Sequence, residues 1–226
     1  MKVFFIIILL FSSFSSYSFP IPNKNKATYD IIRKNKIIGS VESVFEIKNQ
    51  DIVLTTTINI EIKVLFIPAY KFFQNTKEVW KNGEFIKITG YTDFEDNREY
   101  YISGEDKDNF FYASGMDGEL IIDKDILPLN YWNKDILKED FLFDTQKGIV
   151  RQIKVKKLDD EIIKINKVKI EAEKYILDAT TNKKDKGPFP QYTIWYAKNG
   201  ELLRFQFTNW KDKKEVITLR NNWIEN

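Results

Sequence analysis

The feature that most restricts the fold of this sequence is an alternation of apolar and polar residues with a period of two. Along residues 52–63 one face of an extended chain is mainly apolar and the other mainly polar; the apolar positions are Ile52, Leu54, Ile58, Ile60 and Ile62. A helix would spread these positions around its circumference, whereas a strand gathers them on one face, so we expect a half-buried strand. Shorter stretches of the same alternation, rich in β-branched and aromatic residues, recur at residues 41–47, 153–155, 168–170, 203–207 and 217–219.

Turn signals separate several of these runs. Asn-Gly and Asp-Gly pairs favour the type I′ turns of tight β-hairpins, and they occur at Asn82-Gly83, Asp117-Gly118 and Asn199-Gly200. Turns at intervals of roughly ten to fifteen residues predict an antiparallel meander of about a dozen strands. Because a single flat sheet of that size is unusual, we expect an all-β fold in which the meander curls into a barrel or half-barrel.

The alternation of apolar and polar residues is lost at residues 126–138, which show no period of two. This break predicts one short helical crossing near 129–138, between the two halves of the meander and plugging one end of the barrel. Asn130 is the expected N-cap of the helix. Trp132 and Ile136 are expected to stack one helical turn apart.

Two further segments are expected at an opening of the barrel. The stretch from Thr181 to Pro190 is rich in lysine and contains glycine and proline, which predicts an exposed loop or a flap. Residues 64–73 are unusually apolar through an expected turn. That apolar turn is a candidate rim for contact with lipid or with a partner protein.

The first 18 residues have the form of a secretory signal peptide. Lys2 gives a basic start, residues 3–11 form a short apolar core, and small residues lead up to a cleavage site after Ser18. The apolar core is far shorter than the roughly 20 residues that span a bilayer, so an uncleaved anchor is the lesser alternative. Cleavage leaves one all-β domain, residues 19–226, with no transmembrane segment. We expect this domain to be periplasmic or secreted.

The chain contains neither histidine nor cysteine, and this absence excludes several mechanisms. Ser-His-Asp triads, Cys-His dyads and zinc sites built from histidine or cysteine are impossible. An exported chain without cysteine also has no disulfide bonds and no lipid-modified cysteine, so its stability must come from its core. We assign no catalytic residue and expect no cofactor.

Catalysis by a pair of carboxylates, as in glycosidases, needs neither histidine nor cysteine and is therefore not excluded. Glu42, Glu61 and Glu78 lie within expected strands and are the first candidates for such a pair. Carboxylates in strands usually occupy the solvated face of an antiparallel sheet, so a buried pair would be the exception.

Charge patterns predict neither a metal site nor a nucleic-acid surface. Two acidic clusters, within residues 93–99 and 105–108, lack the spacing of a calcium-binding loop and fall where turns are expected. With 35 basic and 33 acidic residues the formal net charge is +2. The broad basic footprint of a nucleic-acid-binding protein is therefore missing. We expect no bound metal and no nucleic-acid partner.

Aromatic residues supply the candidate binding site. Tryptophan on a curved sheet usually belongs to the core, but larger curled sheets also enclose apolar cavities. Tyr131 and Trp132 stand out because they lie where the strand pattern stops. The candidate ligand-binding residues are Tyr131, Trp132, Asn133, Phe66, Tyr70, Trp80 and Trp195.

Several short motifs, spread over most of the chain that follows the signal peptide, also resemble a known family. They are Tyr29-Asp30-Ile31 with Ile38-Gly39, Glu78-x-Trp80 before the Asn82-Gly83 turn, Tyr131-Trp132-Asn133, and Trp195-Tyr196 before Asn199-Gly200. Together they resemble the DUF6134 and DUF3108-like families of exported bacterial proteins of unknown function. The resemblance implies an all-β curved sheet or barrel in the cell envelope, with no established activity and no catalytic residues to transfer. Asn130 departs from the pattern, which would place a serine before Tyr-Trp-Asn.

These observations lead to three hypotheses. The leading one is a non-enzymatic, barrel-like envelope protein that binds a lipid, another apolar ligand or a partner protein. The alternatives are a carboxylate-dependent hydrolase acting on envelope polysaccharide, and a structural or assembly factor with no ligand pocket. The hydrolase requires two buried carboxylates in one cleft, whereas the leading hypothesis requires apolar side chains around an opening.

Overall fold

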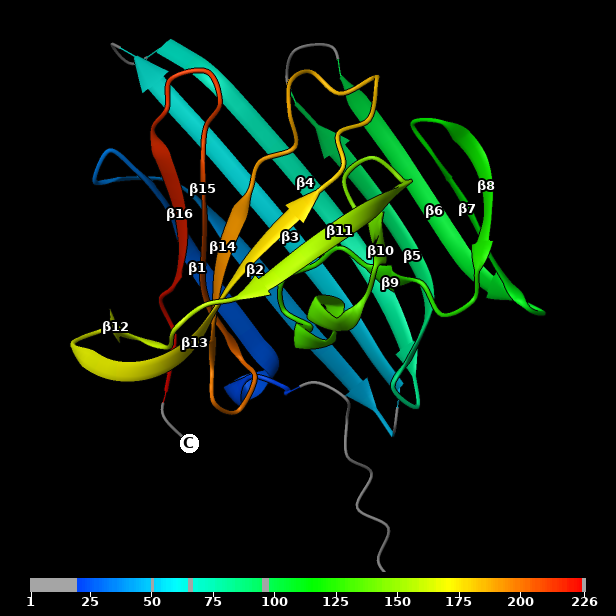
Figure 1. Cartoon of the computed structure of the whole chain (residues 1–226), viewed down its shortest axis with the longest axis horizontal. Helices are drawn as coiled ribbons and strands as arrows, with labels where there is room; N and C mark the ends of the chain where they lie inside the picture. The colour runs from blue at the N-terminus through cyan, green and yellow to red at the C-terminus, as the bar shows by residue number, and fades with distance from the viewer. Residues whose placement is uncertain (1–19, 50, 65–66, 95–97, 225–226) are drawn as a thin grey trace, which may run out of the picture.

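The computed structural model describes residues 20–49, 51–64, 67–94 and 98–224, and the first half of this chain is an antiparallel meander (Figure 1). Its elements are the short 3₁₀ turn η1 (Asn23–Asn25) and the strands β1 (Lys26–Arg33), β2 (Lys36–Lys48), β3 (Asp51–Val64), β4 (Ile67–Lys81), β5 (Glu84–Asp93), β6 (Glu99–Lys107), β7 (Phe110–Gly115) and β8 (Gly118–Asp123). Each strand pairs with the next one in the sequence. In the turn between β4 and β5, Asn82 and Gly83 both have positive φ, 51° and 86°, as a type I′ turn requires.

The second half begins with a short pair of parallel strands and continues as a second antiparallel meander. Its elements are β9 (Leu127–Pro128), the 3₁₀ helix η2 (Lys134–Lys138), β10 (Phe141–Asp144), β11 (Ile149–Lys157), β12 (Glu161–Ile165), β13 (Val168–Ala179), β14 (Tyr192–Ala197), β15 (Leu202–Thr208) and β16 (Glu215–Arg220). β9 and β10 pair in parallel, and β12 pairs only with β13. None of the helices in the described ranges is long and apolar enough to cross a membrane.

Strands β1 and β16 join the two halves into one sheet of 16 strands, with Tyr29 opposite Arg220. The strand order is β8-β7-β6-β5-β4-β3-β2-β1-β16-β15-β14-β13-β11-β10-β9, so the terminal strands β8 and β9 do not pair and the curve stays open. The predicted all-β, curled architecture is confirmed. The sheet has 16 strands where about a dozen were predicted, and β9, β10 and β12, of two to five residues, are the shortest of them.

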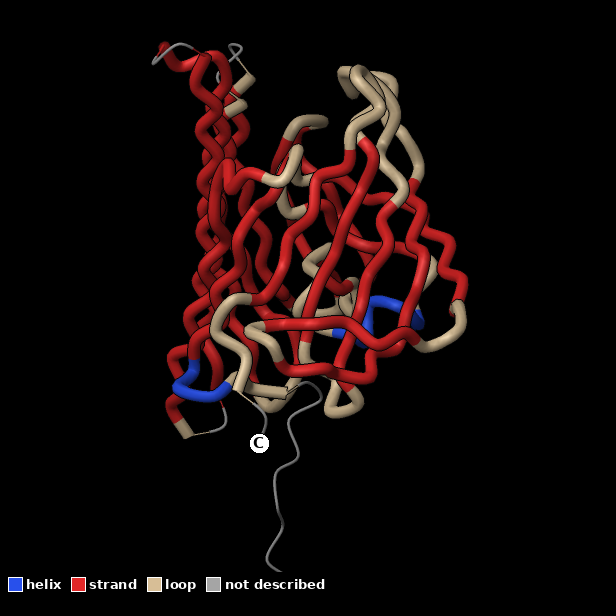
Figure 2. Tube along the Cα trace, turned by 90° about the vertical axis from the view of Figure 1, so that its left-hand side faces the viewer, coloured by secondary structure: helices blue, strands red, loops and turns tan. Residues whose placement is uncertain are grey.

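The curved sheet encloses a packed core. Figure 2 shows the long strands of the first half as a wall on the left and the strands of the second half curving past on the right. Two apolar clusters fill the space between them, one around Trp80 and Phe143 and the other around Leu142 and Tyr196. Leu142 and Phe143 are neighbours on β10 but pack into different clusters, and both are 0 % exposed.

The predicted helical crossing is present as η2, but its details differ from the prediction. The N-cap is Asn133, whose side-chain oxygen accepts a hydrogen bond from the backbone N–H of Asp135 at 3.0 Å. Asn130 was the wrong cap because it lies a full turn before the helix. Trp132 and Ile136 do not stack, since Trp132 precedes the helix and the two side chains belong to different clusters.

The open seam narrows where the β7–β8 turn meets the β10–β11 turn. The backbone N–H of Met116 donates to the carbonyl oxygen of Lys147 at 2.7 Å. The two backbones are so close that a Cβ atom on Gly115 would lie 2.4 Å from that oxygen. Gly148 completes the contact at a φ of +66°, which glycine adopts without strain. The sheet thus approaches closure through turn contacts and without a strand pair.

Candidate ligand-binding site

Five partly buried rings gather on the concave face of the second half of the sheet. We call this group the aromatic cluster; it consists of Tyr131, Phe189, Tyr192, Phe205 and Phe207. The ring centroid of Tyr131 lies 4.7 Å from that of Phe205 and 4.9 Å from that of Tyr192. Tyr192 in turn lies 5.3 Å from Phe207 and 5.7 Å from Phe189. These separations fall in the range of favourable aromatic contacts, so the five rings form one packed group.

Strand geometry explains three of the five positions. Phe205 and Phe207 are two residues apart on β15 and therefore project from the same face. Tyr192 on β14 lies directly opposite Phe207. Tyr131 instead comes from the crossing segment, and Phe189 comes from the loop between β13 and β14. The placement of these last two rings depends on two polar anchors.

The polar groups within the aromatic cluster are the phenol hydroxyls of Tyr131 and Tyr192. The rings of Tyr131 and Tyr192 are in contact, and the hydroxyl of Tyr196 donates to the backbone oxygen of Tyr131 at 2.8 Å. Burial raises the pKa of Tyr192 to about 12 and raises the pKa of Tyr131 well above its usual value. Both phenols are therefore neutral near pH 7. A site of this kind suits an uncharged, apolar ligand with few polar atoms.

The first anchor is Glu78 on β4, which holds the crossing segment. Its side chain is 1 % exposed; the amide of Asn130 donates to its two oxygens at 3.0 and 2.9 Å, and the indole of Trp80 donates at 3.0 Å. Burial raises the pKa of Glu78 to about 7, although hydrogen bonds from Trp80, Asn130 and Trp132 act in the opposite direction. Because Asn130 directly precedes Tyr131, this anchor positions the Tyr131 ring.

The second anchor is a buried ion-pair network that holds the loop bearing Phe189. Arg151 on β11 is 1 % exposed and donates to Asp144 at 2.6 Å and to Asp185 at 2.9 Å. Burial opposes ionisation of Asp185, but its bonds from Arg151 and Lys147 outweigh burial and lower its pKa to about 2. The guanidinium of Arg151 also lies 4.6 Å from the ring centre of Phe189. One arginine therefore fixes both the loop and its aromatic side chain.

Four of the residues predicted for the site lie in or beside the crossing segment. Tyr131 is a member of the aromatic cluster. Trp80 and Trp132 pack against each other at 5.4 Å in the core, where they are 1 % and 8 % exposed. Asn133 and Trp80 line a shallow hollow of about 310 Å³ beside η2. Trp80 thus packs against Trp132 of the crossing segment in the core, and of these four residues only Tyr131 belongs to the aromatic cluster.

The other three predicted residues are not part of this group. Trp195 lies on the opposite face of β14, 2 % exposed in a third apolar cluster beneath the β12–β13 hairpin. Tyr70 on β4 is 39 % exposed. Phe66 lies outside the described residues, as does the predicted cleavage site after Ser18.

Four members of the cluster were not predicted as site residues: Phe189, Tyr192, Phe205 and Phe207. Phe205 and Phe207 belong to an alternating run that was recognised only as a strand. Phe189 and Tyr192 lie at the end of the loop that was predicted to cover an opening. Aromatic residues next to that loop were the signal that would have found this site.

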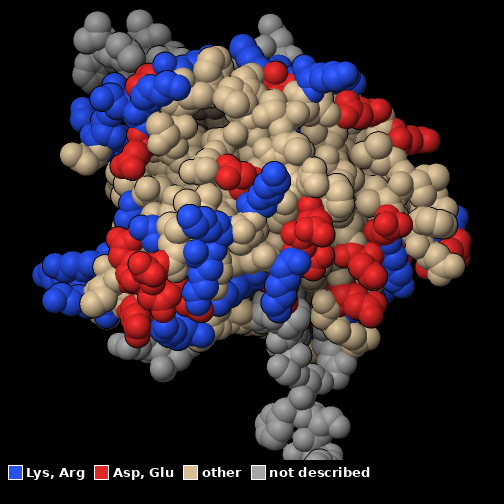
Figure 3. Space-filling view, in the orientation of Figure 1, with Lys and Arg blue, Asp and Glu red and all other residues tan. Residues whose placement is uncertain are grey.

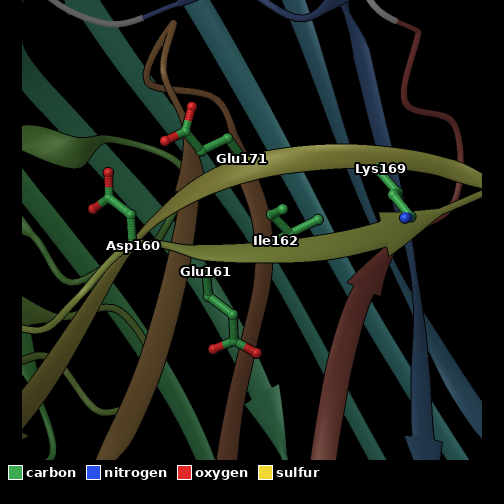
Figure 4. A pocket seen from close by; sticks show the side chains of 5 residues that line it. All are labelled: Asp160, Glu161, Ile162, Lys169 and Glu171. Atoms are coloured by element: carbon green, nitrogen blue, oxygen red, sulfur yellow. The ribbon is translucent and has the colours of Figure 1, made fainter.

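A second hollow, of about 310 Å³, lies on the β12–β13 hairpin (Figure 4). The residues that line it are Asp160, Glu161, Ile162, Lys169 and Glu171. Their side chains point in different directions, with Glu161 directed away from the carboxylates of Asp160 and Glu171. Lys174 pairs with Glu161 at 2.7 Å, and Lys198 pairs with Asp160 at 2.6 Å. Lys198 also lies 3.6 Å from Glu171, so Asp160 and Glu171 share one lysine, whereas Glu161 is held apart from them by Lys174.

The carboxylates considered for hydrolysis also lie apart. Glu42 and Glu61 are exposed, and Glu78 is buried. Two further buried carboxylates, Asp144 and Glu201, each pair with an arginine of their own. Burial and three hydrogen bonds account for the pKa of Glu78, with no neighbouring carboxylate among its causes. The described residues thus offer Glu78 no second carboxylate for an acid–base pair.

The structure is similar to a crystal structure described as a beta-barrel-like protein of domain of unknown function DUF1849 from Brucella abortus. The TM-score is 0.61 at 11 % sequence identity, over 86 % of this chain and 94 % of that chain. At this identity the similarity concerns the fold alone. No curated protein matches the chain. The family described as Domain of unknown function (DUF6134) matches residues 29–219, from β1 into β16, and the chain therefore belongs to the DUF6134 family.

Proposed function

We propose that this protein is a non-enzymatic envelope protein, exported with cleavage after Ser18, whose aromatic cluster binds an apolar ligand. The observation that carries the proposal is the gathering of five partly buried, uncharged rings on the concave face of an open sheet. Binding sites for small molecules are typically concave and apolar, with a few polar groups that fix orientation. The phenol groups of Tyr131 and Tyr192, whose rings are in contact, are such polar groups.

The origin of the rings supports ligand entry. Tyr131 and Phe189 come from segments outside the main strand ladder, so a shift of these rings would disturb their polar anchors but not the strand pairing that holds the sheet. Figure 3 shows a mainly uncharged upper central area on one face of the molecule, with charges of both signs interspersed elsewhere on this face.

A fluorescent apolar probe, N-phenyl-1-naphthylamine, tests the proposal by titration. The double variant Tyr192→Ala/Phe205→Ala removes two rings from the cluster, and each aromatic contact contributes about 0.5–1.5 kcal/mol beyond its buried area. We expect affinity for the probe to fall about tenfold or more. Tyr101→Ala is the matched control, because Tyr101 is 70 % exposed on β6 and its loss should leave binding unchanged.

Near-ultraviolet circular dichroism of the variants shows whether the fold is retained. Equal probe affinity in the native protein and a folded double variant would contradict ligand binding at the cluster. Export is tested separately by fractionating cells that produce a C-terminally tagged chain. We expect tagged protein outside the cytoplasm that begins at Phe19, and tagged protein that keeps Met1 in the cytoplasm would contradict export.

A further inference from the structure

The sheet ends at β8, whose outer edge has no strand partner in the described parts of the chain. On its inner edge β8 pairs with β7, where Tyr112 lies opposite Ile121. Figure 1 shows β8 as the outermost strand at the right of the molecule. The outer edge of a terminal strand presents a row of backbone N–H and C=O groups with which another extended chain can pair.

The side chains of β8 alternate between two environments. On the convex face Glu119, Ile121 and Asp123 are exposed, and Ile121 is exposed to 68 %. On the concave face Leu120 and Ile122 are partly buried against the core. A strand added to this edge would extend the core on one face, and on the other it would meet an apolar residue between two acids.

The apolar character of the convex face continues inward from Ile121. Its partner on β7, Tyr112, is 42 % exposed, and Phe110 on the same strand is 44 % exposed. The two rings contact each other with centroids 6.5 Å apart. An apolar side chain placed beside Ile121 would therefore join an existing apolar surface.

The acids on this edge are not neutralised within the described chain. Neither Glu119 nor Asp123 has an ion-pair partner there, whereas the nearby Asp106 and Asp117 are paired with lysines at 3.2 and 2.8 Å. Acidic side chains also appear along the right-hand edge of the molecule in Figure 3. The charge of this edge is thus available to a partner.

The same charges exclude a second copy of β8 as the partner strand. In an antiparallel pair centred on Ile121, Glu119 of each copy would lie opposite Asp123 of the other. Like charges directly opposite each other destabilise a strand pair. The partner must instead bring positive charge to both positions.

We propose that β8 is a docking edge for an extended segment of another protein in which lysine or arginine flanks three apolar residues. In the antiparallel register the basic residues lie opposite Glu119 and Asp123, and the central apolar residue lies beside Ile121. Main-chain hydrogen bonds then supply affinity, and the alternating side chains supply specificity. This docking edge is on the first half of the sheet and does not depend on a ligand in the aromatic cluster.

Labelled peptides with the core Lys-Val-Leu-Val-Lys and Glu-Val-Leu-Val-Glu test the proposal by fluorescence anisotropy with the full chain. We expect the native protein to bind the basic peptide about tenfold or more tightly than the acidic one, because two opposed charge pairs are gained or lost. The variant Glu119→Lys/Asp123→Lys should reverse this preference. The control Glu46→Lys/Asp159→Lys makes the same charge change at two exposed residues outside β8 and should retain the native preference.

Hydrogen exchange locates the bound peptide. We expect slower exchange at residues 118–123 when the basic peptide is bound to the native protein. Absence of binding, equal binding of both peptides, or a loss of preference in the control variant as large as in the β8 variant would overturn the proposal. Protection confined to another strand would also overturn it and would identify a different docking surface.

Discussion

The amide of Asn130 donates to both carboxylate oxygens of Glu78, at 2.9 and 3.0 Å, across 52 residues of sequence. This bond ties the crossing segment to β4 in the interior of the curved sheet. It also combines a buried charge with the segment that carries Tyr131. The stability of the fold and the geometry of the aromatic cluster are therefore coupled at this pair.

The variant Asn130→Ala tests the coupling. It leaves a buried carboxylate with fewer donors, which costs about 1–3 kcal/mol of unfolding free energy. We expect the loss at pH 8, where Glu78 is largely ionised, to exceed the loss at pH 5, where it is protonated. Urea unfolding at both pH values measures the difference. Asn59→Ala, at an exposed position on β3, is the control, and an equal small loss in both variants would contradict the assigned role.

The raised pKa of Glu78, about 7 against a usual 4.5, predicts an unusual dependence of stability on pH. The folded protein keeps a proton that the unfolded chain releases, so the contribution of Glu78 to stability is fully present below pH 4.5 and is lost as the pH rises to about 7. The fall is on the order of 3 kcal/mol. Because the chain has no histidine, the side chain that most often titrates in this window is absent.

Glu78→Gln has no proton to release and should remove the contribution of Glu78 to the slope of unfolding free energy against pH between 4.5 and 8, which leaves a smaller slope than in the native protein. Glu42→Gln, at an exposed position on β2, should keep the slope of the native protein. The comparison uses the slope, so it is insensitive to any uniform change in stability caused by the substitution. A Glu78→Gln variant with the native slope would show that another group titrates.

Local patterns were sufficient for the parts of this fold that depend on neighbouring residues. The alternation identified a strand, β3, on which the inward side chains of Ile52 and Leu54 are 0 % exposed. The Asn82-Gly83 turn and the crossing at η2 were likewise visible, because turn chemistry and a lost period are properties of short segments. The resemblance to the DUF6134 family also came from short motifs and is confirmed.

The candidate site was less predictable because it is assembled from distant segments. Tyr131 meets Phe205 across 74 residues of sequence, and no local pattern encodes that contact. Trp195 shows a second limit. Alternation says that Trp195 and Ile194 face opposite ways, but it does not say which face is concave, and Ile194 is the one that faces the interior. Which face of β14 is turned inward depends on how the whole sheet curves, and that curvature is a tertiary property.

Arg151 is predicted to be the most sensitive charged residue of the second half. The substitution Arg151→Leu leaves Asp144 buried without its cation and Asp185 with only Lys147 as a partner, and breaking a buried pair in this way costs about 3–5 kcal/mol. Unfolding by urea measures the cost. Lys154→Leu, on the exposed face of the same strand, should change stability by no more than about 0.5 kcal/mol.

A more local readout separates the role of Arg151 in the loop from its role in stability. Hydrogen exchange at residues 181–190 should be faster in Asp185→Asn, because the weaker bond to Arg151 releases the loop while the pair with Asp144 remains. Unchanged exchange in that loop would show that Phe189 is held by other contacts.

The contact of Gly115 with the β10–β11 turn predicts that the narrow end of the seam contributes to stability. In Gly115→Ala the new Cβ would lie 2.4 Å from the carbonyl oxygen of Lys147 and 2.5 Å from Gly148, both backbone atoms that cannot rotate away. Such overpacking costs about 1–3 kcal/mol. Ser114→Ala, at the preceding residue, adds no atom to the contact and should be nearly neutral.

The position of the effect distinguishes steric separation of the seam from a general loss of stability. If the two turns are pushed apart, the amide of Met116 loses its bond to Lys147, and exchange should accelerate at Met116 and at residues 146–148. The strands β2–β4 lie far from the seam in the strand order and should keep their native protection. Acceleration spread evenly over all strands would instead indicate global destabilisation, and the turn contact would then have no separate role in holding the curved sheet nearly closed.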